Sequence, residues 1–139
     1  MRARRGMALA FLAVSCSACL GQGTGTQARG EDVDSRIVGT WRGNSVCLVK
    51  GSPCRDEQNV YRFSKLAGRS GTFSGTGGKV VDGREIVMGR GDWTYDAEKH
   101  VLECKTPDIR MVVNGTRIEG ALKLPDGTAY RRIFLKKQD

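Results

Sequence analysis

From Ile37 to Lys137 the chain alternates apolar and polar residues with a period of two rather than 3.6. Successive side chains of a β-strand point to opposite faces, so this period predicts strands with one buried face and one solvated face. No window of ten residues in this region shows the pattern of an amphipathic helix. The alternation is clearest in the runs 60–64, 71–75, 92–95, 109–113 and 117–119. We therefore expect an all-β domain over residues 37–139.

Turn signals separate these runs at regular intervals. Asp82-Gly83 and Asn114-Gly115 are signals for two-residue hairpins, because both central positions of a type I′ turn need a positive φ. Residues 96–99 and 125–128 have the composition of four-residue turns. Such short connections place each strand beside the next one. The sequence therefore predicts an up-and-down antiparallel meander of eight or nine strands, which can close into a barrel and so remove both free edges.

The glycine-rich run 75–79 (GTGGK) is similar at first sight to a phosphate-binding loop. It departs from that motif at two positions, because Phe73 stands where the first glycine belongs and Val80 where a serine or threonine must bind magnesium. We expect this run to form a flexible hairpin and no phosphate site.

The first eighteen residues have the organisation of a secretory signal peptide. Arg2, Arg4 and Arg5 make a cationic start, residues 7–14 (MALAFLAV) are apolar, and small residues follow. The apolar run is less than half as long as a membrane-spanning helix, so it predicts export rather than a transmembrane segment.

Two cysteines follow this apolar run, and the segment resembles the lipobox of bacterial lipoproteins. That resemblance implies lipidation of Cys16 or Cys19, with Cys16 favoured because it follows the apolar run directly. We expect a lipid-anchored protein of the cell envelope, attached to the membrane by its lipid alone. Cleavage near Ala18 and a soluble secreted product is the alternative. Residues 19–36 are rich in Gly, Thr and Gln and predict a flexible tether.

Export also permits disulfides, and the folded region contains three cysteines. Cys47 and Cys54 flank a short loop with a Gly and a Pro, and a bridge between them would contribute about 2–3 kcal/mol on the chain-entropy model. Cys104 then has two possible states, a buried thiol or a partner of Cys19. The sequence predicts no zinc site in the folded region, because His100 is the single histidine and Cys47, Cys54 and Cys104 form no C-x-x-C.

Charge and catalytic motifs narrow the function further. The net charge is +8, and removal of the three signal arginines leaves 20 basic against 15 acidic residues. These charges are spread along the chain rather than gathered in a stripe, so we expect no nucleic-acid partner. No G-x-S-x-G motif and no metal-spaced cluster occur. We therefore predict no enzyme activity, no catalytic residue and no cofactor.

The first strand, beginning Gly39-Thr40-Trp41, resembles the G-x-W opening of lipocalin-like proteins, the calycins. The last strand, 129–136, places Arg131 on one face with Ile133 and Leu135. The resemblance implies an eight-stranded barrel in which Trp41 closes one end and Arg131 packs across its ring. The chain is shorter than true lipocalins and lacks their long first loop. Residues 39–63 also resemble small exported bacterial proteins.

Aromatic side chains with the inward parity predict the interior of this barrel. An eight-stranded barrel has room for its own side chains or for one small ligand, so two interpretations stay open: core filling and a ligand cage. The residues concerned are Tyr61, Phe63, Phe73, Trp93 and Tyr95.

The resemblance implies a non-enzymatic, extracytoplasmic binding domain for a small apolar ligand or an envelope component, and we expect a monomer. The alternative is an envelope-tethered protein that inhibits a secreted protease or lysozyme by plugging its cleft with a loop or a terminus.

Overall fold

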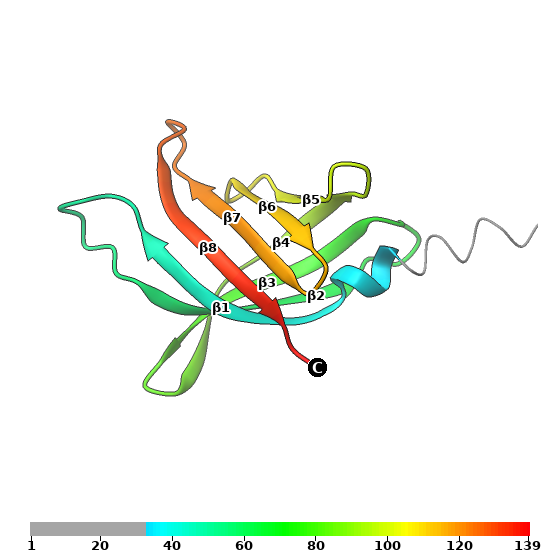
Figure 1. Ribbon diagram of the computed structural model, residues 1–139, viewed down its shortest axis with the longest axis horizontal. Helices are drawn as coiled ribbons and strands as arrows, with labels where there is room; N and C mark the ends of the chain where they lie inside the picture. Colours follow the sequence, from blue (N-terminus) through cyan, green and yellow to red (C-terminus); the bar gives the residue numbers. More distant parts are fainter. Residues whose placement is uncertain (1–32) are drawn as a thin grey trace, which may run out of the picture.

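Eight antiparallel strands form one closed barrel, in which each strand pairs with the next and β8 pairs with β1 (Figure 1). The computed structural model describes residues 33–139. This architecture confirms the all-β, up-and-down meander and its closure. The strands are β1 (Gly39–Cys47), β2 (Glu57–Lys65), β3 (Thr72–Val81), β4 (Arg84–Asp96), β5 (Val101–Cys104), β6 (Ile109–Asn114), β7 (Arg117–Lys123) and β8 (Ala129–Lys137).

The core lies inside the barrel and is built from the alternating apolar positions. In β6, for example, Ile109, Met111 and Val113 are buried while the residues between them are exposed. Burial of apolar surface at about 25 cal/mol per Å² is the main force that holds such a barrel closed. The buried cluster comprises Ile37, Trp41, Tyr61, Phe63, Phe73, Trp93, Tyr95, Leu102, Cys104, Ile109, Met111, Val113, Ile118, Ile133 and Leu135.

The folded domain includes residues that precede Ile37, where we expected it to begin. Residues 33–37 form one helical turn, and Ile37 is completely buried. Asp34 fixes the turn to the barrel, since it accepts a hydrogen bond from the Gly71 amide at 3.2 Å and pairs with Lys65 at 2.6 Å. Residues 33–36, which we assigned to the tether, therefore belong to the domain. The predicted signal peptide, Cys16, Cys19 and the rest of the tether lie outside the described residues.

Within the described range, 33–139, no helix is long and apolar enough to span a membrane.

The two predicted hairpin turns differ in their outcome. Asp82 and Gly83 both have positive φ, 51° and 75°, and they join β3 to β4 as predicted. In the β6–β7 hairpin Asn114 pairs with Arg117, so the turn residues are Gly115 and Thr116, one position later than predicted. Of this pair, Gly115 has a positive φ, 58°. That geometry suits a turn with glycine at its first central position.

The run 75–79 is not a hairpin, and that prediction was wrong. It lies inside β3, which continues to Val81. Glycine is needed at Gly75 because a Cβ atom there would lie 2.4 Å from Trp93 Nε1 and 2.9 Å from Phe63 Cδ1. The glycines thus let aromatic rings pack against the backbone, and between Gly77 and Gly78 they accommodate a register shift in the pairing with β4.

Beyond this shift the ends of β3 and β4 project from the barrel as a hairpin, seen in green at the lower left of Figure 1. We call residues 78–87 the arm. Glu85 ties the arm to the barrel wall, because its carboxylate pairs with Arg42 of β1 and with Arg62 of β2, the latter at 2.6 Å. These two arginines hold the pKa of Glu85 below its usual value, chiefly through the hydrogen bond from Arg62.

Candidate functional site

The predicted interior aromatics all lie in the barrel core, where none exposes more than 8% of its surface. Trp93 packs edge-on against Phe63 and Tyr61, with ring centroids 5.2 and 6.0 Å apart. These separations are those of favourable aromatic contacts, and they leave no space between the rings for a ligand. The packing therefore favours core filling over a ligand cage.

Two tyrosines in this core carry polar hydroxyl groups. Burial raises the pKa of Tyr61 to about 12, and the nearby positive charge of Arg131 opposes that rise. The Tyr61 phenol therefore stays protonated at neutral pH. The Tyr95 hydroxyl lies 3.3 Å from His100 Nδ1, at the margin of the core.

The predicted stacking of Arg131 on Trp41 is wrong, and Lys137 takes that place. Trp41 is directly opposite Lys137 in the β1–β8 ladder, and Lys137 Nζ lies 5.6 Å from the centre of the Trp41 ring. Arg131 is opposite Cys47 at the other end of the same ladder. Arg131 and Lys137 are six residues apart on β8, which corresponds to about 20 Å along an extended strand. Arg131 has the predicted inward parity, but along the barrel axis it lies at the other end of the β1–β8 ladder from Trp41.

Lys137 also binds the helical turn at this end. Its Nζ donates to the carbonyl oxygens of Ser35 at 2.6 Å and of Arg36 at 3.1 Å. Partial burial lowers the pKa of Lys137. The Trp41 indole donates to the Ile37 carbonyl oxygen at 2.9 Å. Trp41 and Lys137 therefore close the barrel against the helical turn.

Arg131 belongs to a polar cluster at the opposite end of the barrel, which the sequence analysis missed. Its guanidinium donates to Ser45 Oγ at 3.0 Å and pairs with Glu57 at 3.4 Å, while Glu57 also pairs with Lys79 at 3.5 Å. Ser45 is 1% exposed. The sequence does contain a signal for this cluster. Polar residues of β1 and β2 occupy positions with the same alternation parity as the buried Trp41 and Tyr61. Asn59 lies opposite Lys79 in the β2–β3 ladder. We call Ser45, Glu57, Asn59, Lys79 and Arg131 the polar mouth.

The predicted disulfide between Cys47 and Cys54 is confirmed, with Cα atoms 5.9 Å apart. The bridged loop is fastened to the polar mouth, because Arg131 donates to the Arg55 carbonyl oxygen at 2.8 Å. Cys104 is a buried free thiol, and its Sγ lies 3.5 Å from the Thr106 carbonyl oxygen. The alternative bridge to Cys19 involves a residue outside the described range.

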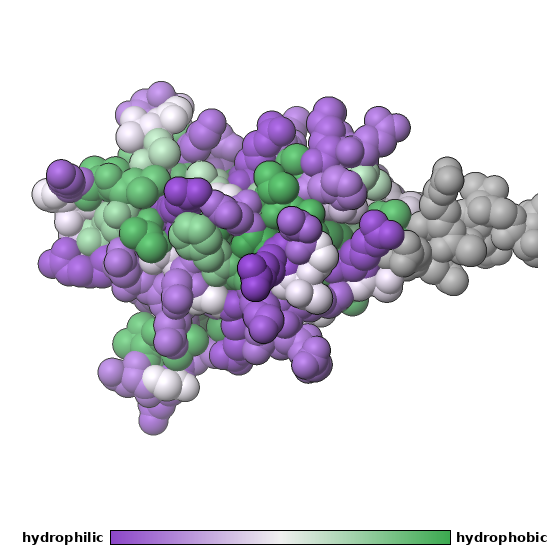
Figure 2. All heavy atoms as spheres, in the orientation of Figure 1, coloured by the Kyte–Doolittle hydropathy of each residue, from purple (hydrophilic) through white to green (hydrophobic). Residues whose placement is uncertain are grey.

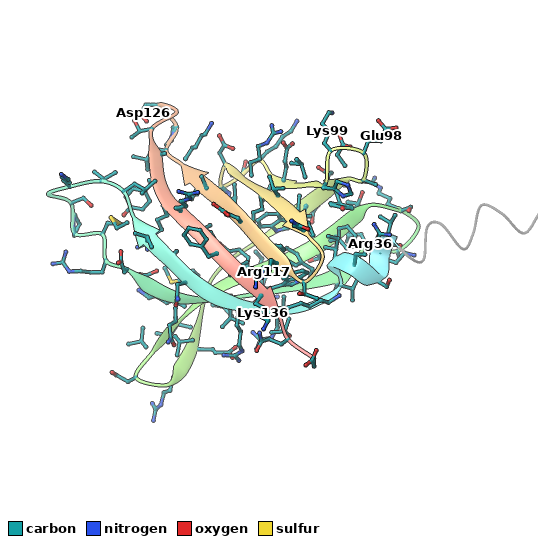
Figure 3. The ribbon with its side chains drawn as sticks, viewed as in Figure 1. Arg36, Glu98, Lys99, Arg117, Asp126 and Lys136 are labelled. Carbon is teal, nitrogen blue, oxygen red and sulfur yellow. A yellow bond between two sulfur atoms is a disulfide. The ribbon has the colours of Figure 1, made fainter. Side chains whose placement is uncertain are left out.

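The two ends of the barrel carry different features. The first, which we call the arm end, has the polar mouth, the bridged loop, the arm and the loop 124–128, which Asp126 marks in Figure 3. The other, the Val33 end, has the helical turn, the loop 97–100 and the β6–β7 turn. Glu98 and Lys99 mark the loop 97–100 in Figure 3, and Arg36 marks the helical turn. Any anchor that precedes residue 33 joins the domain at the Val33 end.

An open groove of about 910 Å³ crosses the outer face of the barrel from β5 to β8. Its middle is Ala121, which lies between Arg110 and Arg132 in the sheet. Both arginines are paired, Arg110 with Glu103 at 3.2 Å and Arg132 with Glu119. Figure 2 shows hydrophobic residues interspersed with hydrophilic ones on this face. Paired charges and scattered apolar groups of this kind are typical of an ordinary solvated surface.

Among residues 33–139 no group of three or more His, Cys, Asp or Glu side chains is close enough to hold a metal ion.

No protein-family model matches the chain, and no curated protein is similar to it in sequence. Among solved structures, a redesigned β-barrel is similar to it, with a TM-score of 0.55 and 16% sequence identity. The similarity covers 77% of this chain and 96% of the designed chain. It shows the fold alone. The fold and the candidate site therefore define a small, closed, eight-stranded antiparallel barrel domain.

Proposed function

We propose that this domain is a non-enzymatic, lipocalin-like binding module that works outside the cytoplasm and contacts an envelope macromolecule through its outer surface. The observation that carries the proposal is the packed interior. The rings of Phe63 and Trp93 are 5.2 Å apart, and even a single Cβ at Gly75 would collide with both. We therefore expect the binding site on the outer surface of the barrel.

The arm end is the surface that best fits this role. It projects a hairpin and a disulfide-fastened loop, and it lies away from Val33, where the chain from the anchor enters. A domain held by that entry point presents its arm end outward. Rigid loops that project from a stable barrel are a common way to display binding residues.

A second function, inhibition of a secreted protease or lysozyme, is favoured by the arm. The arm is a narrow projection that the Glu85 ion pairs tie to the barrel wall, and a narrow projection is the shape needed to enter an enzyme cleft. Stoichiometric loss of a hydrolase activity on addition of the domain, reversed by deletion of the arm tip Asp82-Gly83, would favour this second function.

Photo-crosslinking from the two ends of the barrel tests the leading proposal. A benzoylphenylalanine at Asp126, on the arm end, should give a discrete crosslinked product in cells that export the protein. The same group at Glu98, an exposed residue of the Val33 end, is the matched control and should give none. Products from Glu98 alone would contradict the proposal. Thermal stabilisation by a fatty acid, used as an apolar probe, would also contradict the proposal, because it would indicate a ligand bound inside the barrel.

The proposal includes a lipid anchor at Cys16 or Cys19, and fractionation tests it. Wild-type protein should sediment with the membrane fraction of its native host, and substitution of both cysteines by serine should release it. Cys104→Ser is the matched control and should leave the distribution unchanged, because Cys104 is buried in the core. A wild-type protein already soluble in the periplasm or medium would contradict the anchor.

A further inference from the structure

The outer edge of β4 has no strand beside it over most of its length. β4 pairs with β3 from Arg84 to Thr94 but with β5 only from Thr94 to Asp96. Within residues 33–139 no other backbone hydrogen bond reaches residues 84–93. Because backbone N–H and C=O groups point alternately to the two sides of a strand, half of those on this segment face solvent. We call residues 84–90 the free edge.

The free edge begins where β5 turns away. β5 ends at Cys104, and the chain then turns through Thr106 and Pro107 toward β6. The turn packs on β4 at Gly91, where a Cβ atom would lie 3.0 Å from Cys104 Sγ and 3.4 Å from the Thr106 carbonyl oxygen. A strand added along residues 84–90 would therefore extend the sheet where the chain itself leaves it.

The middle of the free edge is apolar and exposed. The exposed fractions of Ile86, Val87 and Met88 are 44%, 56% and 63%, and Val81 across the arm is 40% exposed. Figure 2 shows the hydrophobic surface on the projecting hairpin at the lower left. An exposed apolar edge strand pairs readily with other chains, and natural proteins usually cover or shorten such edges. This one is left open in the described part of the protein.

Two arginines flank the apolar middle and give the free edge a charge preference. Neither Arg84 nor Arg90 forms an ion pair with any described residue. The nearby carboxylate of Glu85 is engaged by Arg42 and Arg62. Arginines on an edge strand discourage pairing with neutral or basic strands. A strand with carboxylates at corresponding positions would instead gain charge-assisted contacts.

We propose that the free edge binds an extended segment of another protein, apolar at its centre and carrying a carboxylate at each end, as a ninth strand beside β4. Main-chain hydrogen bonds would give affinity, and the flanking arginines would give selectivity. This inference rests on the proposed binding function and names the chemistry of the partner. A second copy fits less well. A second copy would bring its own Arg84 and Arg90 to this edge, and like charges across a pair of strands are destabilising.

Two capped peptides test this assignment on the full chain labelled with ¹⁵N. The probe is Glu-Val-Thr-Val-Thr-Glu, whose two carboxylates lie on opposite faces of a strand, as Arg84 and Arg90 do because Met88 is an extra residue between them. Its matched control carries Lys in place of both Glu. The acidic peptide should shift the amide resonances of residues 84–90 and slow their hydrogen exchange. It should bind at least about tenfold more tightly than the basic peptide, the ratio expected from two exposed charge pairs.

Paired charge variants identify the cause of that preference. Arg84→Gln with Arg90→Gln should reduce the ratio of the two affinities to below about threefold. Arg69→Gln with Arg117→Gln removes the same charge from exposed sites elsewhere and should leave the ratio close to that of the wild type. None of the four residues is in the core, so amide spectra of the variants should otherwise match those of the wild type.

Absence of peptide binding, binding centred outside residues 84–90, or equal affinity for the two peptides would overturn the inference. Resonances of residues 84–90 that move with protein concentration alone would overturn it in favour of a second copy. The outcomes are separate from those of the crosslinking experiment. Peptide binding without a crosslink from Asp126 would leave the free edge in place and remove the proposed outward-facing function. A crosslink from Asp126 without peptide binding would overturn the inference about the free edge and leave the proposed function in place.

Discussion

Replacement of Trp41 by alanine is expected to lower the free energy of unfolding by about 3–5 kcal/mol, the usual range for deleting a large buried aromatic side chain. Trp41 is completely buried, and the change would also leave the Ile37 carbonyl oxygen without its indole donor. The helical turn 33–37 should loosen at the same time. Urea denaturation followed by circular dichroism measures the loss, and Trp93 remains as a fluorescent reporter.

Double-mutant cycles then test which cation acts with Trp41. Lys137→Ala should be non-additive with Trp41→Ala, because Lys137 Nζ lies over the ring. Arg131→Ala should be additive with Trp41→Ala, because Arg131 lies beside Cys47 at the other end of β8. A coupling of Trp41 to Arg131 rather than to Lys137 would contradict the register of the β1–β8 ladder.

Replacement of Gly43 by alanine is expected to destabilise the barrel by about 3 kcal/mol or more, at the upper end of the usual cost of overpacking. A Cβ atom at Gly43 would lie 1.8 Å from the Phe134 carbonyl oxygen and 2.9 Å from the Leu135 Cα. Both contacts are to backbone, so relief requires β1 and β8 to separate at the seam that closes the barrel. Hydrogen exchange should therefore accelerate along β1 and β8 before it does in β3.

Gly89→Ala is the matched control, because nothing lies within 4 Å of a Cβ atom at that β4 position. This variant should unfold within about 1 kcal/mol of the wild type, or be slightly more stable, since glycine in a strand costs about 0.5–1 kcal/mol relative to alanine. Equal destabilisation by Gly43→Ala and Gly89→Ala would mean that the seam is not closely packed, and the closure argument would fail.

The period of two was enough to predict most of the strands and the buried aromatics, because alternation directly reports which face of a strand is covered. The turn signals supplied the meander order. Alternation does not report height along the barrel axis. Arg131 and Lys137 have the same parity, and only the paired ends of β1 and β8 decide which of them meets Trp41. That register depends on where both strands begin and end, which the sequence alone leaves open.

The arm illustrates a second limit. Glycines at 75, 77 and 78 give no side chain from which to judge alternation, and the register shift beside them reverses the parity that follows. Without that parity, Ile86 and Val87 cannot be assigned to the core or to solvent. The polar mouth is a different case. Glu57 and Asn59 have inward parity in the sequence, but polar residues are not expected inside a barrel unless their ion-pairing partners are known.

Both ends of the described chain meet at the same end of the barrel. The Gln138 amide donates to the Thr40 carbonyl oxygen at 2.8 Å, and Lys137 binds the carbonyl of Ser35. A fluorophore, an affinity tag or a surface linker can therefore be attached after Asp139 with little change in how the domain is presented. The arm and the bridged loop would remain accessible on an immobilised sample, which suits this chain to surface-based binding measurements.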